Sequence, residues 1–356
     1  MRIVFLGLSV TSSWGNGHAT NYRALMRALE ARGHHVLFLE RDVPWYASQR
    51  DLPDPPWGRT ELYGSLGELR ERHAGAVRAA DLVVVGSYVP EGVAVGEWVV
   101  ETARGLPAFY DIDTPVTLAK LARGDYEYLA PHLVGRYELY LSFTGGPTLR
   151  RIEDELGSPR AVAFHCLVDP EAYPPDPAAE LRWDLGYLGT YSDDRQPALE
   201  RLLLEPARRD PTLRCVVAGP QYPDGIDWPV NVERIEHLPP AEHAAFYAAQ
   251  RFTVNVTRAD MVRAGWSPSV RLFEAAACAV PVISDRWDGL DSFFAPGSEI
   301  VIADSSEDVL RALRETGDAA RRAMGEAARS RVLAEHTAAR RVQQLESEVV
   351  GRVAAA

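Results

Sequence analysis

Residues 265–274, with the sequence Gly-Trp-Ser-Pro-Ser-Val-Arg-Leu-Phe-Glu, combine a helix start with two charged side chains. Ser267 followed by Pro268 predicts a helix with the serine as its N-cap and the proline at its first position. Arg271 and Glu274, three residues apart, would share one face of that helix. Free N–H groups and Arg271 favour an anion there, and Glu274 could accept hydroxyl hydrogen bonds from a ribose. The pattern indicates a site for a nucleoside diphosphate; a capped helix with an Arg271–Glu274 ion pair is the ordinary alternative.

Other groups suited to a nucleotide stand at the ends of apolar runs in the second half of the chain. They are Gly189, Thr190 and Tyr191; His237 and Leu238; and Arg258. Arg258 could neutralise a diphosphate together with Arg271, because a guanidinium presents two N–H groups to a phosphate; a solvated surface charge is the alternative. The glycine loop allows close approach of the backbone. The loop with His237 could contact the edge of a base, or it could be a plain connection.

Three loops in the first half also follow apolar runs. They carry Asn16, Gly17 and His18; Asp111 and Asp113; and Gly145 and Gly146. His18 could act as a general base or bind a sugar hydroxyl, and otherwise it is a polar surface histidine. One of the two aspartates is expected to be buried in a turn while the other faces a ligand. The glycine pair fits either turn geometry or a close approach of the backbone to a ligand.

Short apolar runs alternate with helical periodicity along both halves of the chain. Residues 2–8, 19–32 and 35–40 predict a strand, a helix and a strand, which is the usual opening of a doubly wound α/β domain. Continuous apolar runs are typical of strands that are buried on both faces of a parallel sheet. The alternation resumes at about residue 184 and ends in a long predicted helix over 319–349.

The length of 356 residues fits two domains better than one, because single cores seldom exceed about 300 residues. Prolines at 170, 174, 175 and 177 mark a linker. We therefore predict an N-terminal domain over 1–168, a linker over 169–180, a C-terminal domain over 181–335 and a final helical segment over 336–356. Two α/β domains joined in this way predict a cleft between them.

Composition narrows the functional classes. Hydrophobic residues make up 46% and charged residues 25%, which is ordinary for a soluble protein. A formal net charge of −12 argues against binding nucleic acid through overall charge. The three cysteines show neither zinc spacing nor a disulfide framework, which favours a reducing compartment, and no signal peptide or membrane span is visible at the N-terminus. We expect a cytoplasmic protein.

A dinucleotide-binding fingerprint is one competing interpretation. Gly15, Gly17 and Glu40 have its outline, but Thr20 occupies the position of the third glycine. The first glycine also falls well past the end of the strand. The fingerprint is therefore weakly supported.

Several of these stretches together resemble nucleotide-sugar glycosyltransferases of the CgeB-like group, the spore maturation protein type. The stretches are 13–18, 111–115, 142–147, 255–258, 267–275 and 281–285, and they span nearly the whole chain. The resemblance implies a GT-B fold, with two Rossmann-like domains facing each other across a cleft. It also implies that the first domain handles the acceptor, the second holds the donor nucleotide, and the C-terminal helix packs back towards the first domain.

Glu274 matches the second glutamate of the Glu-x7-Glu motif of retaining glycosyltransferases, which holds the donor ribose. The first glutamate falls at Trp266 in this chain, so the donor sugar and the stereochemical outcome are left open. Arg258 resembles the phosphate-binding cation of such enzymes, and His18 resembles the histidine that follows the first strand. The residues expected on the donor side are Glu274, Arg271, Arg258, Ser269, Ser267, Gly189, Thr190, Tyr191, His237 and Leu238. Those expected on the acceptor or sugar side are Asn16, Gly17, Asp111, Gly145, Gly146 and Trp266.

The expected activity is metal-independent glycosyl transfer from a nucleotide-diphosphate sugar, UDP- or dTDP-linked, to an unidentified acceptor. The donor is a substrate, and no cofactor or metal is expected. His18 or Asp113 would be the catalytic base if the reaction inverts configuration. A nucleotide-sugar epimerase or phosphorylase on the same fold, or a catalytically degenerate nucleotide-sugar-binding protein, is the alternative. The sequence leaves a homodimer open.

Overall fold

The computed structural model describes residues 1–353 and divides the chain into two compact units. Unit 1 combines residues 1–167 with 338–356, and unit 2 comprises residues 168–337. The segment predicted over 336–356 contains helix α15 (Ala338–Val353), which belongs to unit 1, and its last three residues lie outside the described part.

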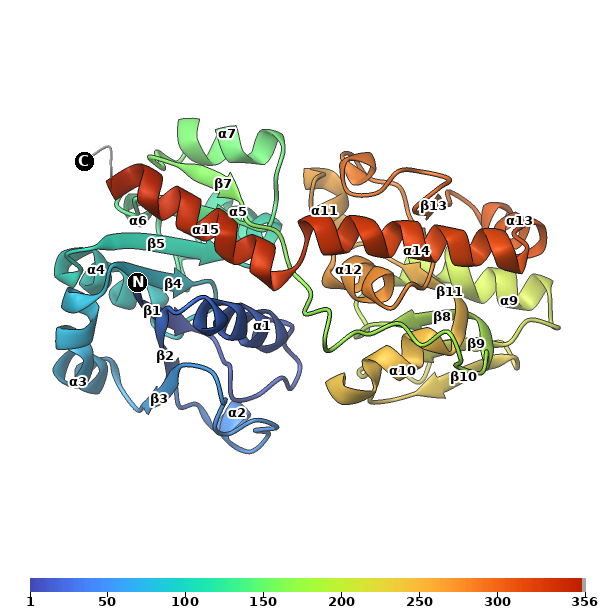
Figure 1. The fold of residues 1–356 in the computed structure, drawn as a ribbon, viewed down its shortest axis with the longest axis horizontal. Helices are drawn as coiled ribbons and strands as arrows, with labels where there is room; N and C mark the ends of the chain where they lie inside the picture. The colour runs from blue at the N-terminus through green and yellow to red at the C-terminus, as the bar shows by residue number, and fades with distance from the viewer. Residues whose placement is uncertain (354–356) are drawn as a thin grey trace. The chain divides into compact units, whose positions relative to one another are not determined.

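Unit 1 is built on a seven-stranded parallel sheet in the order β3-β2-β1-β4-β5-β6-β7 (Figure 1). Its strands are β1 (Arg2–Gly7), β2 (His35–Arg41), β3 (Arg59–Tyr63), β4 (Leu82–Gly86), β5 (Leu106–Asp111), β6 (Leu139–Ser142) and β7 (Ala161–Ala163). Its helices are α1 (His18–Ala31), α2 (Pro44–Ala47), α3 (Leu66–Ala79), α4 (Gly92–Thr102), α5 (Thr114–Ala122), α6 (Pro131–Val134), α7 (Pro147–Asp154) and α15. Every residue of β4 is buried, because helices cover both faces of the sheet.

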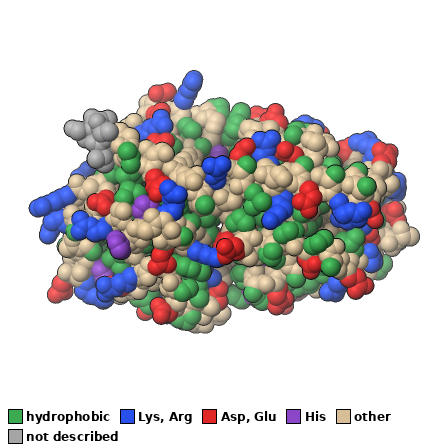
Figure 2. Space-filling model, in the orientation of Figure 1, with side chains coloured by type: hydrophobic (Ala, Val, Ile, Leu, Met, Phe, Trp, Pro, Cys, Tyr) green, Lys and Arg blue, Asp and Glu red, His purple; other side chains and the backbone are tan. Residues whose placement is uncertain are grey.

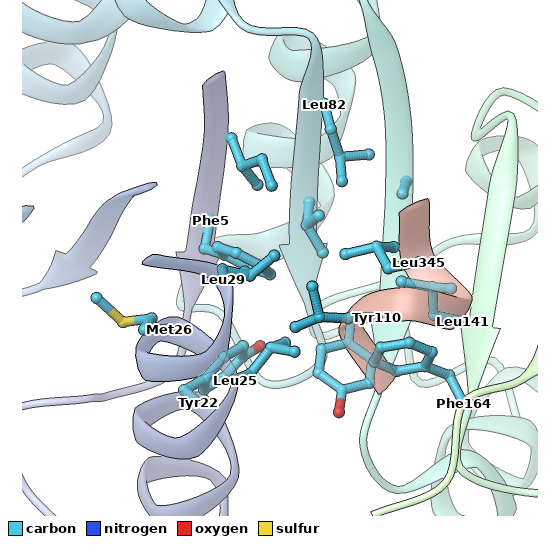
Figure 3. Close-up of a cluster of buried hydrophobic side chains, with 14 of the residues drawn as sticks. Phe5, Tyr22, Leu25, Met26, Leu29, Leu82, Tyr110, Leu141, Phe164 and Leu345 are labelled. Atoms are coloured by element: carbon cyan, nitrogen blue, oxygen red, sulfur yellow. The ribbon is translucent and has the colours of Figure 1, made fainter. Parts of the chain in front are cut away.

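The last helix completes the core on one face of this sheet. Figure 3 shows Leu345 of α15 among side chains of the sheet, including Tyr110 of β5 and Leu141 of β6. Helix α1 contributes Tyr22, Leu25, Met26 and Leu29 to the same cluster. Unit 1 therefore buries this face only when residues from both ends of the chain are present.

Unit 2 contains a six-stranded parallel sheet in the order β10-β9-β8-β11-β12-β13. Its strands are β8 (Trp183–Leu188), β9 (Cys215–Ala218), β10 (Val232–Ile235), β11 (Gln250–Asn255), β12 (Val282–Ser284) and β13 (Val301–Ile302). Its α-helices are α8 (Gln196–Leu199), α9 (Glu205–Arg209), α10 (His243–Ala248), α11 (Ala259–Ala264), α12 (Val270–Ala277), α13 (Ser306–Glu315) and α14 (Asp318–Glu335). A π-helical turn (Glu200–Leu204) joins α8 to α9, and 3-10 turns occur at Pro240–Glu242 and Leu290–Ser292.

The single long helix predicted over 319–349 is instead two helices, α14 and α15, separated at His336 and Thr337. The ring of His336 stacks on Phe273 with centroids 4.3 Å apart, and the carbonyl of His336 accepts the N–H of Val168 at 3.0 Å. These tertiary contacts interrupt a helical pattern that has neither proline nor glycine at the break.

Both sheets reverse their strand order beside their first strand. In unit 1 the reversal lies between β1 and β4, and in unit 2 it lies between β8 and β11. Ligands of doubly wound sheets bind at the carboxyl ends of the strands on either side of such a reversal. The loops that follow these four strands are therefore the positions to search for a site.

Candidate functional site

Arg271 lies in the first turn of α12 and is only 8% exposed. Its Nη1 donates to Oδ1 of Asn255 at 3.1 Å, its Nε donates to the carbonyl of Leu188, and its Cζ lies 4.6 Å from the ring centroid of Tyr187. These contacts hold the guanidinium between the ends of β8 and β11. Its Nη2 makes no hydrogen bond to any residue in the described range, so Arg271 can use this nitrogen to bind an anion.

The backbone of Gly189 passes close to this guanidinium. A Cβ atom at Gly189 would lie 2.6 Å from Nη2 of Arg271, and a Cβ atom at Gly219 would clash with the carbonyl of Gly189. The N–H of Gly189 donates to the carbonyl of Ala218 at 2.9 Å, and its carbonyl accepts from the Tyr222 hydroxyl at 3.1 Å. The loop after β8 therefore needs glycine because Arg271 lies directly against it.

Asn255, the last residue of β11, orients the start of α12. Its Oδ1 accepts hydrogen bonds from Oγ of Ser269 at 2.6 Å and from Nη1 of Arg271 at 3.1 Å. Its Nδ2 donates to Thr257 at 3.1 Å and to Ser284 at 2.9 Å. A buried amide with all four interactions satisfied has one orientation, and it fixes the two side chains bonded to it. Sequence reasoning gave Asn255 no role, although a polar residue at the end of a buried strand was a visible signal.

Two further arginines belong to the loops beside Arg271. Nε of Arg258 lies 3.7 Å from Oδ2 of Asp194, and the same oxygen accepts the N–H of Ala259 at 2.9 Å. Arg195 donates from Nη1 to the carbonyl of Thr190 at 3.3 Å, while its buried Nε has no acceptor among the described residues. A buried N–H without an acceptor is costly unless a ligand supplies one. The sequence places Arg195 in the same loop as Gly189 and Thr190, although it was not among the expected donor-side residues.

The start of α12 differs from the prediction, because Ser269 and not Ser267 occupies the N-cap position. Oγ of Ser267 donates to the carbonyl of Gly265 at 3.0 Å. Gly265 and Trp266 have positive φ angles of 64° and 43°, and a residue that precedes proline disfavours the helical region. The chain therefore stays out of the helix until Ser269, whose hydroxyl binds Asn255 and not the helix N-terminus.

Trp266 packs against the loop that contains Gly289. A Cβ atom at Gly289 would lie 2.5 Å from Cδ1 of the indole, and the N–H of Trp266 donates to the carbonyl of Asp288 at 2.7 Å. The indole is half-buried.

Glu274 forms no ion pair with Arg271, so the ordinary alternative of an intrahelical pair is wrong. Its carboxylate accepts hydrogen bonds from the hydroxyls of Tyr173 at 2.8 Å and Tyr247 at 3.1 Å, and the residue is 5% exposed. Arg271 and Glu274 lie on the same helix, but Arg271 binds Asn255 whereas Glu274 binds two tyrosine hydroxyls.

The remaining predicted donor-side residues lie in two loops. The hydroxyl of Tyr191 donates to Asp193 at 2.6 Å. His237 is exposed, and the carbonyl of Leu238 accepts from Nε2 of His243 at 3.3 Å. The loop at 236–239 follows β10, which lies at the edge of the sheet.

In unit 1 the loop after β5 separates its two aspartates. Asp111 is fully buried, and its carboxylate accepts from Thr117 at 2.6 Å, from the Tyr140 hydroxyl at 2.5 Å and from the N–H of Asp113 at 3.3 Å. Burial raises the pKa of Asp111 to about 6. Asp113 is half-buried and its Oδ2 accepts from the Tyr88 hydroxyl at 3.3 Å. Asp111 is thus enclosed by the protein, whereas Asp113 is the carboxylate that a ligand can reach.

His18 begins α1, directly after the loop that follows β1. It is 9% exposed, and its Nδ1 has no hydrogen-bond partner within residues 1–353. Burial lowers its pKa to about 4, so the imidazole is neutral near pH 7. Its ring lies 5.5 Å from the ring of Tyr88, which follows β4. His18, Tyr88 and Asp113 therefore meet at the reversal point of this sheet, and Tyr88 was not predicted.

The small residues predicted nearby are engaged in local structure. Oδ1 of Asn16 accepts the N–H of Ala19 at 3.0 Å and thereby caps α1, while Gly17 holds the N-cap position. Gly146, with a φ of 58°, occupies the N-cap position of α7. A Cβ atom at Gly145 would lie 3.1 Å from the ring of His165. Close packing and turn geometry account for this glycine pair.

Glu40 settles the dinucleotide interpretation. Its buried carboxylate accepts from the N–H groups of Val10 at 2.6 Å and Thr11 at 3.0 Å, and from the hydroxyls of Ser9 at 3.1 Å and Thr11 at 2.6 Å. With four internal donors and no exposed surface, it organises the loop after β1 and is not available to a ribose.

Comparison with known proteins supports the architecture. A family profile described as glycosyl transferase-like matches residues 195–347, which is less than half of the chain. The structure is similar to sucrose-phosphate synthase from Thermosynechococcus elongatus, with a TM-score of 0.70, 15% identity and coverage of 100% of both chains. It is similar to Anabaena HepE in complex with UDP-glucose, with a TM-score of 0.70, 13% identity and coverage of 99% of this chain and 100% of HepE.

A third similar structure is an alpha-glucosyltransferase in complex with UDP-glucose and DNA containing an abasic site. Its TM-score is 0.71 at 12% identity, with coverage of 98% of this chain and 99% of the other. No curated protein matches the sequence. The predicted architecture of two Rossmann-like domains of the GT-B type is confirmed by these structures, which at such identities show the fold alone.

On the face in Figure 2, Lys and Arg are interspersed with Asp and Glu over both units. Within the described part of the chain, no group of three or more His, Cys, Asp or Glu residues is arranged to hold a metal ion. No helix in that same part has the length and apolarity needed to span a membrane.

Proposed function

We propose that the protein is a CgeB-like glycosyltransferase that moves a sugar from a UDP-sugar to an acceptor without a metal ion. The observation that carries the proposal is the buried guanidinium of Arg271, which lies against Gly189 with Nη2 left without a protein acceptor. Arg258 and Arg195 supply further positive charge in the neighbouring loops. Preorganised cations and backbone N–H groups stabilise the diphosphate that departs in glycosyl transfer, and this effect is worth several kcal/mol in order of magnitude.

Unit 2 is proposed to bind the nucleotide and unit 1 the acceptor. In unit 2, Glu274 would accept the ribose hydroxyls and the loop with His237 and Leu238 would contact the base. The similarity to HepE and to the alpha-glucosyltransferase, both described in complex with UDP-glucose, supports uracil as the base. A dTDP-linked donor is the alternative to be tested.

In unit 1, His18 and Asp113 are proposed to act at the acceptor side. The lowered pKa of His18 keeps its ring neutral and able to take a proton, which suits a general base in an inverting reaction. In a retaining reaction no protein base is needed, and His18 would orient the sugar. The cysteines Cys166, Cys215 and Cys278 are buried and free, which supports a reducing, cytoplasmic location.

Calorimetric titration with UDP and UDP-glucose tests the donor assignment. Arg258→Ala should weaken UDP binding on the order of tenfold or more, because it removes a charge-assisted contact with phosphate. Arg263→Ala is the matched control, since Arg263 lies near the C-terminal end of α11, is exposed and pairs with Asp260. Full donor binding and turnover in Arg258→Ala would contradict the diphosphate assignment.

A catalytically degenerate nucleotide-sugar-binding protein is the second candidate, because Trp266 replaces a carboxylate expected near the donor sugar. Release of UDP from UDP-glucose, measured with and without a panel of acceptors, separates the two. Turnover that depends on an acceptor supports the transferase. Binding without turnover under every condition supports the degenerate protein, and conversion that needs no acceptor or needs free phosphate indicates an epimerase or a phosphorylase.

A further inference from the structure

Two buried tyrosines from separate parts of unit 2 hold the carboxylate of Glu274. Tyr173 lies in the segment that precedes β8, and Tyr247 lies in α10. The Tyr173 hydroxyl is 2.8 Å from Oε1 and the Tyr247 hydroxyl is 3.1 Å from Oε2. Tyr173 is 3% exposed and Tyr247 is fully buried, so both hydroxyls are enclosed with the carboxylate.

The direction of these hydrogen bonds is fixed. Burial, together with the nearby charge of Glu274, raises the pKa of both tyrosines well above 10, so each hydroxyl keeps its proton. An ionised carboxylate only accepts, and its two oxygens offer about four acceptor positions. Two of these are used by Tyr173 and Tyr247, which leaves two for hydroxyl groups of a ligand.

A histidine also lies beside the Tyr173 hydroxyl. Its hydroxyl oxygen lies 3.3 Å from Nδ1 of His243, whose Nε2 lies 3.3 Å from the carbonyl of Leu238. Because a carbonyl only accepts, Nε2 of His243 is the donor in its contact with Leu238. The single hydroxyl hydrogen of Tyr173 is donated to Glu274, which is 0.5 Å nearer to the hydroxyl oxygen (2.8 Å against 3.3 Å) than the histidine nitrogen is. A continuous chain of contacts runs from the loop at 236–239 to the carboxylate.

We propose that Tyr173 and Tyr247 are positioning residues that orient Glu274 so that its two free acceptor positions receive the 2′ and 3′ hydroxyls of a ribose. The inference rests on the proposed binding of a UDP-sugar in unit 2. A glutamate has three side-chain torsions, and no basic residue pairs with this carboxylate in the described part of the chain. The two tyrosine hydroxyls are therefore the contacts that select one orientation of the group.

Calorimetry with UDP and 2′-deoxy-UDP gives the ratio of the two affinities. This ratio reports how well the carboxylate of Glu274 is oriented towards the 2′ hydroxyl. The wild-type protein should prefer UDP by about tenfold, as expected for a hydrogen bond to a charged group. Tyr173→Phe and Tyr247→Phe should each reduce that preference to about twofold to threefold, because a carboxylate that is no longer fixed makes a weaker bond to the 2′ hydroxyl. Tyr137→Phe is the matched control, since it removes a buried hydroxyl that has no hydrogen-bond partner among the described residues.

A merely structural role for the tyrosines would weaken both nucleotides equally, and an unchanged ratio in folded variants would overturn the inference. Glu274→Gln provides a second route if a tyrosine variant does not fold, because it keeps the shape of the side chain and should also reduce the preference for UDP. If Glu274→Gln kept the wild-type preference for UDP over 2′-deoxy-UDP, the inference would likewise be overturned. If the folded wild-type protein binds no UDP at all, the proposed function fails; if it binds UDP through Arg258 but does not distinguish the deoxy nucleotide, only this inference fails.

Discussion

Replacement of His18 should change how the stability of unit 1 depends on pH. Burial lowers the pKa of His18 from 6.5 to about 4, so between these values the unfolded chain binds a proton that the folded protein does not. The contribution of His18 is therefore fully present above about pH 6.5 and is lost as pH falls towards 4. Between pH 7 and pH 5 the linkage amounts to about 2 kcal/mol, since each pKa unit corresponds to about 1.4 kcal/mol.

Equilibrium urea unfolding at pH 5, 6 and 7 measures this effect in the wild-type protein, His18→Gln and His18→Phe. Hydrogen exchange of peptides from β1 and β4 assigns the transition to unit 1. Neither variant titrates at this position, so each should lose about 2 kcal/mol less than the wild type between pH 7 and pH 5. Phenylalanine also keeps an aromatic ring beside Tyr88, which separates the loss of the titrating group from the loss of packing.

The contributions of other titrating groups to the pH dependence of the unfolding free energy cancel in this comparison, because all three proteins contain those groups. Asp111 acts in the opposite direction, because its pKa is raised to about 6 and the stability gained from its protonation is lost as pH rises through that value. The reasoning would be refuted by variants that follow the wild-type pH profile to within about 0.5 kcal/mol, because His18 would then take up its proton equally in both states.

Two further substitutions test the loops that follow the first strand of each unit. Gly189→Ala would place Cβ 2.6 Å from Nη2 of Arg271. The substitution should weaken UDP binding more than about tenfold by calorimetry and leave the circular dichroism spectrum unchanged. Unaltered UDP binding would contradict the close approach of this loop to Arg271. Glu40→Gln replaces a buried carboxylate that accepts four hydrogen bonds with an amide that has one acceptor oxygen. Its free energy of unfolding should fall by about 2–4 kcal/mol in urea titration, and a loss below about 0.5 kcal/mol would show that Ser9, Val10 and Thr11 do not depend on this group.

Much of the fold follows from the sequence because strands buried on both faces appear as continuous apolar runs. The first strand, helix and strand, predicted over 2–8, 19–32 and 35–40, lie within one residue of β1, α1 and β2. Strand β3 was not predicted, because its sequence Arg-Thr-Glu-Leu-Tyr belongs to the edge of the sheet and carries charge where a central strand carries valine or leucine.

The candidate site was predictable as a set of loops but not as a set of contacts. Helical spacing placed Arg271 and Glu274 on one face, yet tertiary partners from β11 and α10 hold them apart. Tyr173 lies in the proline-rich segment interpreted as a linker, and no local pattern indicates that it contacts a glutamate 101 residues later. Ser267 and Ser269 are equally plausible caps by residue type, and the positive φ at Trp266 decides between them.

The contribution of α15 to unit 1 has a consequence for the biogenesis of the protein. Ala338, Val342, Leu345 and Val349 complete a hydrophobic cluster whose other members come from residues 1–167. The ribosome must therefore translate all of unit 2 before this cluster can close. Unit 2 is one uninterrupted stretch of chain, so all of its residues are available before α15 is synthesised and covers the apolar face beside α1. Domains usually complete folding from the N-terminus during synthesis, whereas the N-terminal unit of this chain is the last to receive all of its residues.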